Sequence, residues 1–133
     1  MEQHSVFLIG GADDEAASLI AEQDGDACNL KCAYGEKVVT ASADDFFEAL
    51  CKIRLVLEAE GLLLFCYGGS LNVYPSGMAR SMASGKVAYR MRTGKHATKE
   101  DLVSIYAQGP DVIPATVAQQ REFFNEWVSG DRA

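Results

Sequence analysis

Three side chains in the second half of the sequence are of types that perform nucleophilic catalysis: Cys66, Ser70 and His96. A thiol or hydroxyl becomes a catalytic nucleophile when it lies within hydrogen-bond reach of a base that a third group orients. Ser70 lacks the G-x-S-x-G sequence that places a serine on a strained turn, and His96 lies in a lysine-rich segment. We therefore expect a protein that is not an enzyme, with no catalytic residue and no cofactor.

Positions 67–80 are dense in hydroxyl, amide and glycine residues, and they directly follow an apolar run. Polar groups that gather at the end of a buried strand, next to backbone made accessible by glycine, are a common way to build a binding site. In such a site Arg80 would hold an anionic group. The candidate ligand-binding residues are Tyr67, Ser70, Asn72, Tyr74, Ser76 and Arg80. Turn chemistry explains the same residues as a hairpin turn, a strand ended by Pro75 and a helix cap at Ser76, and we favour that interpretation.

Gly10-Gly11 follows a predicted strand, where nucleotide-binding folds place a phosphate loop. The third glycine of such a loop and its Lys-Ser/Thr ending are missing. The acids Asp13, Asp14 and Glu15 stand at the start of a helix that we predict over residues 12–23. These carboxylates satisfy the helix dipole themselves and repel phosphate, which excludes a nucleotide site here.

Four cysteines, Cys28, Cys32, Cys51 and Cys66, are too widely spaced for a typical zinc site. Such a site shows two close pairs of ligands, whereas only Cys28 and Cys32 are near each other and both histidines lie elsewhere. We expect free, mostly buried thiols and no metal site.

The net charge of −7 is unevenly distributed along the chain. Residues 1–61 hold 13 acids and 4 bases, whereas residues 62–133 hold 6 acids and 8 bases. An acidic surface repels the phosphate backbone, which excludes a protein that coats nucleic acid, but it steers basic protein partners. The candidate partner-binding residues are the acids at two predicted helix starts: Asp13, Asp14, Glu15, Asp44, Asp45 and Glu48.

The clearest predicted element is a helix over residues 42–60, because apolar residues recur there at helical spacing and Ser42 with Asp45 forms a capping-box sequence. Residues 116–129 form a second helix, capped by Thr116 and Gln119. A short helix over 76–82 begins at the Ser76 cap.

The remaining segments favour strands. Residues 62–67 are continuously apolar, which predicts a central strand covered on both faces. Thr98-x-x-Asp101 looks like a cap, yet the residues that follow it are strand formers, and we predict a strand there. The other predicted strands are 5–9, a hairpin of 28–34 with 37–41, 71–74 and 86–92, and the ambiguous segment is 102–107.

Together these elements predict a single α+β domain over residues 1–133, with a largely antiparallel sheet of five or six strands and two main packed helices. A doubly wound α/β fold is the alternative. The first residues carry an acid where a signal peptide would carry lysine or arginine, and the apolar runs are too short to span a membrane. We therefore expect a cytoplasmic protein.

The block 67–91, with NVYPSGM at 72–78 and the pair Ala88-Tyr89, resembles small uncharacterised bacterial immunity-type proteins. The resemblance implies a cytoplasmic toxin inhibitor. It covers less than a third of the chain and transfers no catalytic residue.

Three functions follow from these observations. The first is a non-enzymatic binding protein, an immunity-type inhibitor whose acids occlude the basic active site of a toxin. The second is a small-molecule-binding domain or enzyme with its polar site at residues 67–80. The third is a homo-oligomer that assembles through an edge strand at residues 86–92.

Overall fold

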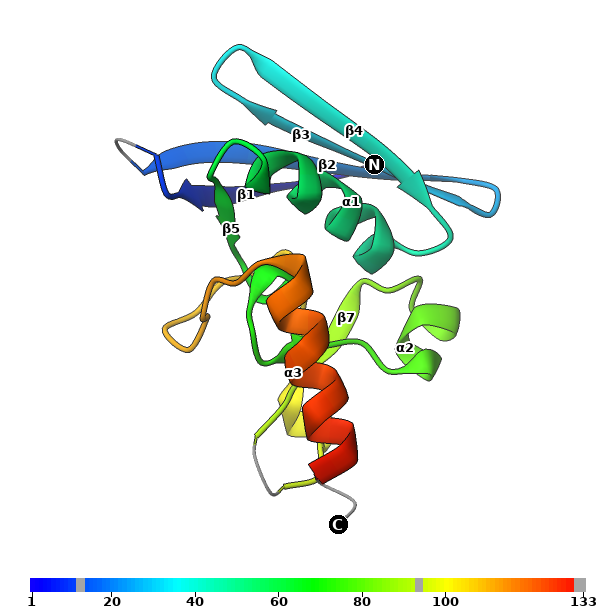
Figure 1. Cartoon of the computed structure of the whole chain (residues 1–133). Helices are drawn as coiled ribbons and strands as arrows, with labels where there is room; N and C mark the ends of the chain where they lie inside the picture. Colours follow the sequence, from blue (N-terminus) through cyan, green and yellow to red (C-terminus); the bar gives the residue numbers. More distant parts are fainter. Residues whose placement is uncertain (12–13, 93–94, 131–133) are drawn as a thin grey trace.

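A computed structural model describes residues 1–11, 14–92 and 95–130 of the chain. It contains a five-stranded sheet in the order β4-β3-β2-β1-β5 and a three-stranded sheet in the order β6-β7-β8. All strand pairings are antiparallel, so the α+β prediction is confirmed and the doubly wound α/β alternative is excluded. Helix α1 lies between the larger sheet and the second half of the molecule (Figure 1).

The elements follow in chain order. They are β1 (Glu2–Ile9), β2 (Glu15–Asp24), β3 (Ala27–Tyr34), β4 (Lys37–Ala43), α1 (Phe46–Glu58), β5 (Leu63–Phe65), the 3-10 turn η1 (Tyr67–Gly69), β6 (Val73–Tyr74), α2 (Gly77–Met82), β7 (Val87–Arg90), the 3-10 turn η2 (Lys99–Asp101), β8 (Leu102–Ser104) and α3 (Val117–Gly130).

The predicted helix over residues 12–23 is wrong, because this segment forms strand β2. Ala17, Leu19 and Ala21 alternate toward the core, and β2 pairs with both β1 and β3. Alanine favours a helix locally, but pairing with two neighbouring strands outweighs that weak preference. Ala12 and Asp13 lie outside the described residues.

The β3–β4 hairpin is confirmed, with a two-residue turn at Gly35-Glu36. Gly35 has φ +56, a backbone conformation that glycine adopts without steric cost and that two-residue hairpins require. The turn closes on the pair Tyr34–Lys37, and the register continues to Cys28–Ala43.

Helix α1 is confirmed, but its N-cap is Asp45 and not Ser42. The Asp45 carboxylate accepts a hydrogen bond from the Glu48 N–H at 2.8 Å, whereas Ser42 still belongs to β4. The predicted central strand over 62–67 is also corrected. The paired part of this segment, β5, lies at an edge of the sheet beside β1. The chain then continues into η1.

The capping sequences of the second half are confirmed. Ser76 caps α2, and Thr116 and Gln119 exchange reciprocal hydrogen bonds at the start of α3. Thr98 and Asp101 form a capping box on η2, and strand β8 follows it directly, so both interpretations of this segment hold. The strand predicted over 86–92 is the central strand β7 of the small sheet and not an edge.

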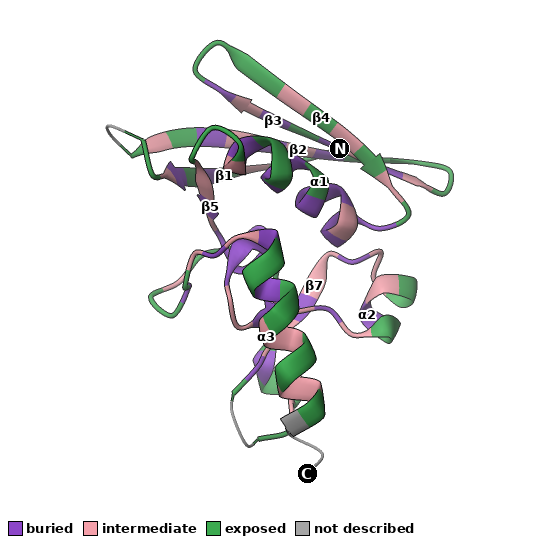
Figure 2. Cartoon of the chain, viewed as in Figure 1, coloured by how far each residue is buried: buried purple, intermediate pink, exposed green. Residues whose placement is uncertain are grey.

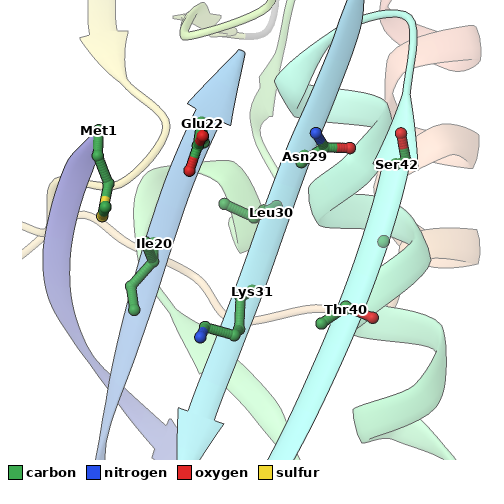
Figure 3. Close-up of a pocket in the computed structure, with 9 residues that line it drawn as sticks. Met1, Ile20, Glu22, Asn29, Leu30, Lys31, Thr40 and Ser42 are labelled. Carbon is green, nitrogen blue, oxygen red and sulfur yellow. The ribbon is translucent and has the colours of Figure 1, made fainter. Parts of the chain in front are cut away.

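The two faces of the large sheet differ. Buried residues alternate with half-exposed and exposed ones along the middle of β2 and along β3 (Figure 2), so that one face of the sheet is buried and the other is open. On the outer face, Ile20, Asn29, Lys31 and Thr40 line a shallow hollow of about 520 Å³ together with Met1, which precedes β1 (Figure 3). Phe7 and Val38 on this face are 47% and 59% exposed.

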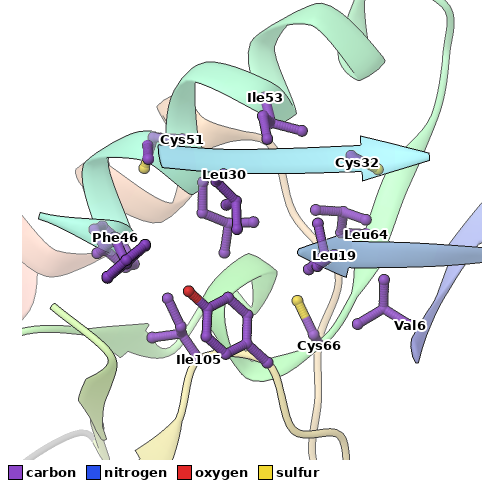
Figure 4. Close-up of a cluster of buried hydrophobic side chains, with 14 of the residues drawn as sticks. Val6, Leu19, Leu30, Cys32, Phe46, Cys51, Ile53, Leu64, Cys66 and Ile105 are labelled. Carbon is purple, nitrogen blue, oxygen red and sulfur yellow. The ribbon is translucent and has the colours of Figure 1, made fainter. Parts of the chain in front are cut away.

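One buried cluster unites both halves of the chain. Phe46, Leu50 and Ile53 of α1 pack against buried strand residues such as Leu19 (Figure 4). Ile105, which follows β8, belongs to the same cluster. Helix α1 therefore packs against both the large sheet and the second half of the chain.

A buried polar network connects α1 to α3 through η1. Arg54 of α1 is only 2% exposed, and its guanidinium donates to the Gln120 Oε1 at 2.6 Å, the Ala115 carbonyl at 2.9 Å and the Gly68 carbonyl at 3.1 Å. The Gln120 amide donates in turn to the carbonyls of Gly68, Ser70 and Val73. No carboxylate of the described residues forms an ion pair with Arg54, so oriented carbonyl dipoles, with the Cys51 sulfur at 3.9 Å, surround this buried charge.

We predict that Arg54→Met lowers the free energy of unfolding by about 3–5 kcal/mol, because it leaves buried carbonyls and the Gln120 amide without their donor. Urea unfolding followed by circular dichroism measures the change. The matched control is Lys52→Met on the exposed side of the same helix, which should cost about 0.5 kcal/mol or less.

The double variant Arg54→Met/Gln120→Met should cost less than the sum of the two single variants, because both residues belong to one network. Strict additivity of the two single changes would contradict this prediction.

Candidate functional site

The acidic end of the molecule is formed where the β2–β3 turn, the end of β4 and the start of α1 meet. Here Asp26, Asp44, Asp45 and Glu48 line an open hollow of about 610 Å³. Asp26 and Asp44 are exposed and Glu48 is half-exposed. We call this surface the acidic end. Its side walls also include Ala27, Ser42, Ala43 and Lys52.

Asp45 is the structural member of the acidic end. Only 7% of this residue is exposed, and besides capping α1 its carboxylate accepts a hydrogen bond from Arg80 Nη1 at 3.0 Å. The Arg80 guanidinium also lies over the rings of Phe47 and Tyr74 and 3.8 Å from Glu48. Arg80 therefore fastens α2 to the start of α1. At this end the carboxylates of Asp26 and Asp44 form no ion pair with any described residue.

Helix α2 exposes two apolar side chains to solvent on the same short helix that carries Arg80. Met78 and Met82, four residues apart, are 70% and 80% exposed. Methionine is flexible and polarisable, and it is over-represented at surfaces that bind other proteins. Sequence analysis missed this pair, although its spacing on a capped helix was visible.

The six acids predicted to bind a partner do not form one surface. Asp44, Asp45 and Glu48 belong to the acidic end, whereas Asp14 and Glu15 lie at the start of β2. Asp26 follows the other end of β2, so the length of this strand, about 30 Å, separates the two groups. Asp13 lies outside the described residues. The six acids were grouped together because a helix was predicted over residues 12–23, where the structure has strand β2.

The side chains of the predicted ligand site at 67–80 point to different partners. The Tyr67 hydroxyl donates to Asp111 at 2.5 Å, which raises the pKa of Tyr67 and lowers that of Asp111. The Ser70 hydroxyl donates to Asn72 and accepts from the Ile113 N–H. The Tyr74 ring stacks on Phe124. With Ser76 capping α2 and Arg80 held by Asp45, turn and packing roles account for five of these six residues.

Asn72 instead lines a hollow of about 280 Å³ together with two ion-paired arginines. Arg90 contacts Asp111 at 3.1 Å, and Arg92 contacts Asp101 at 2.8 Å. The Arg90 Nε is buried without a hydrogen-bond partner among the described residues. Sequence analysis noted the excess of bases over acids in residues 62–133, but not that tertiary folding places Asp101 and Asp111 beside two of these bases.

The candidate nucleophiles are inaccessible. Cys66 and Ser70 are both fully buried, and burial raises the pKa of the Cys66 thiol. All four cysteines are free and buried, and burial raises the pKa of Cys32 to about 11. Among the described residues no three of His, Cys, Asp or Glu are grouped to hold a metal ion. No helix in the described part of the chain is long and apolar enough to cross a membrane.

No protein-family model matches this chain, and no curated protein matches it either.

We predict that none of the four thiols reacts appreciably with an aromatic disulfide reagent in the native protein, whereas all four react in denaturant. Burial both blocks access and disfavours the reactive thiolate. A Thr40→Cys variant, with an exposed thiol, is the positive control. Rapid native labelling mapped to Cys66 by mass spectrometry would contradict the prediction and restore this residue as a candidate nucleophile.

A second prediction concerns acid stability. The Thr98 N–H and the Arg92 guanidinium donate to the buried Asp101 carboxylate and hold its pKa below its usual value. A lowered folded-state pKa gives stability that is present above about pH 4 and is lost as the pH falls through the folded value. Asp101→Asn should therefore cost about 1–2 kcal/mol at neutral pH and progressively less toward pH 2.

Urea unfolding at a series of pH values measures this difference. A cost that stays constant from neutral to acidic pH would show that the Asp101 charge does not contribute. Glu100→Gln, at the exposed neighbouring position, is the control.

Proposed function

We propose that the protein is a cytoplasmic, non-enzymatic binding protein that holds a basic protein partner at its acidic end. The observation that supports this proposal is the hollow in which the exposed carboxylates of Asp26 and Asp44 and the half-exposed Glu48 lie together. Lys52, the cation of this hollow, donates to the Ser42 carbonyl at 2.8 Å, so part of its charge is engaged within the fold.

The surroundings of the hollow suit a protein partner better than a small ligand. The hollow is open, and the exposed Met78 and Met82 stand on α2, which Arg80 fastens to the same end of α1. Exposed acids raise the association rate with a basic surface, whereas apolar side chains that become buried lengthen the residence time. Carboxylates and methionines together provide both kinds of contact.

As an immunity-type inhibitor, the protein would cover the active site of a toxin. Asp26, Asp44 and Glu48 would then occupy positions that the phosphates of a nucleic-acid or nucleotide substrate take in a basic cleft. The rigid position of Asp45, which is tied to both α1 and Arg80, keeps the free acids in place before the partner arrives.

Charge reversal tests this proposal. Tagged protein is used to capture partners from the lysate of the native host, and mass spectrometry quantifies them. We predict that Asp26→Lys/Asp44→Lys recovers a stoichiometric partner at least about tenfold less well than the wild type, and that high salt has the same effect on the wild type.

The matched control is Asp14→Lys/Glu36→Lys, which changes the net charge equally at the opposite end of the sheet. Equal loss of the partner in both double variants would show that net charge, and not the acidic end, determines binding. Recovery that does not respond to salt would also contradict the proposal. If no protein is recovered and a metabolite raises the melting temperature, the small-molecule alternative at the Asn72 hollow is favoured.

A further inference from the structure

Strand β4 is an edge strand, and within the part of the chain that the structure describes no strand pairs with its outer backbone groups. The two-residue turn makes Tyr34 and Lys37 a hydrogen-bonded pair, and such pairs alternate along an antiparallel ladder. Lys37, Val39, Ala41 and Ala43 therefore bond to β3. The N–H and C=O groups of the residues between them, Val38, Thr40 and Ser42, point away from the sheet.

One hydrogen bond agrees with this alternation. The Ser42 carbonyl accepts the Lys52 ammonium at 2.8 Å, which it can do only if it faces away from β3. A carbonyl has two lone pairs, so this contact leaves room for a second donor.

Beyond its first residue, Lys37, which pairs with Glu60, the sequence of β4 does not protect its edge. Soluble proteins usually guard an edge strand with charged side chains, proline or a bulge. Between Lys37 and Asp44 the strand reads VVTASA, without a charge or a proline, and its register with β3 runs without a bulge. An unguarded edge of this length is a template for another strand.

The side of α1 beside this edge carries exposed apolar side chains next to the charged Lys52. Lys52, Val56 and Ala59 are spaced along one side of the helix, and Lys52 reaches β4, so this side faces the edge. Leu55 and Val56 are 54% and 46% exposed. The edge of β4 and the exposed side of α1 form one continuous surface, which consists of a strand layer and a helix layer. We call this surface the β4 flank.

We propose that this flank binds a second copy of the chain, with the two β4 strands antiparallel and Thr40 on the two-fold axis. In this register Val38 of one copy pairs with Ser42 of the other, and Thr40 pairs with itself. Every outward backbone group of the three residues then finds a partner, which gives six hydrogen bonds. Shifting the register by two residues would pair Val38 with Asp44, beyond the end of the strand.

The same register explains why a second copy fits better than an unrelated strand. Residues directly opposite each other in an antiparallel pair point to the same face, so a pairing centred on Thr40 places both α1 helices on the same side of the extended sheet. The exposed Leu55 and Val56 of the two helices then lie across the axis from each other. An isolated peptide strand would satisfy the backbone but leave this stripe uncovered.

The dimensions of the flank predict a modest affinity. A seven-residue strand is about 23 Å long and a sheet with one helix layer is about 20 Å deep, so the two copies bury about 1,000 Å² in total. That area is at the low end for specific interfaces, and we expect a weak dimer. Each copy carries a net charge of −7, so salt should strengthen this dimer, opposite to its effect on a basic partner.

Sedimentation equilibrium over a wide concentration range tests the proposal. The wild type should approach a dimer at high concentration, and Thr40→Glu should raise the dissociation constant at least tenfold, because it places two like charges directly opposite each other. Within one copy this carboxylate would face Lys31, so the fold is not expected to suffer. Ser18→Glu, on the same sheet face but on strand β2, is the control and should behave like the wild type.

Two measurements locate the contact. Thr40→Cys should form a covalent dimer on mild oxidation, whereas Ser18→Cys should not, since only residues at the axis bring their own copies within the Cα separation of a disulfide. Amide hydrogen exchange should show concentration-dependent protection of Val38, Thr40 and Ser42. A wild type that stays monomeric at high concentration, or a dimer that Thr40→Glu does not weaken, would overturn the proposal.

Discussion

The buried guanidinium of Arg54 is the contact on which the arrangement of the second half depends. Only 2% of this residue is exposed, so the chain must supply acceptors for its five N–H donors. Those acceptors come from η1, from the segment before α3 and from Gln120 on α3 itself. Gln120 then binds three carbonyls of the chain between η1 and β6. Segments far apart in the sequence are thereby held at one position on α1.

The close packing around this network leaves no room for a side chain at Gly68. Its carbonyl accepts from both Arg54 and Gln120, and a Cβ atom at this position would lie 2.5 Å from Leu50 Cδ2 and 2.9 Å from the Ile105 carbonyl. The glycine-rich sequence after β5, which suggests a ligand loop, is therefore required by the approach of backbone to helix. The polar residues around it are largely engaged in the same way, as the Tyr67–Asp111 and Ser70–Asn72 hydrogen bonds show.

Many of the polar side chains of the second half thus act within the fold, and our two binding proposals rest on two other surfaces. The acidic end presents carboxylates that nothing in the fold neutralises fully, and the β4 flank presents backbone groups and apolar side chains. The two surfaces share Ser42 and Lys52, but we propose a basic partner for the first and a second, acidic copy of the chain for the other. Salt weakens the attraction of a basic protein to the first and reduces the repulsion between like copies at the second.

Local patterns in the sequence determined the elements whose signals are themselves local. The stripe of Phe46, Leu50, Ile53 and Leu57 defines α1, and the caps at Ser76, Thr98 and Thr116 start α2, η2 and α3, because each depends on residues within one or two turns. Only the tertiary structure decided that Ala17, Leu19 and Ala21 form a strand, because pairing with β1 and β3 outweighs a weak helical preference. It also decided that Asp45 binds Arg80 while Asp44 remains free. Adjacent residues in a sequence cannot reveal which of two carboxylates meets a cation 35 residues away.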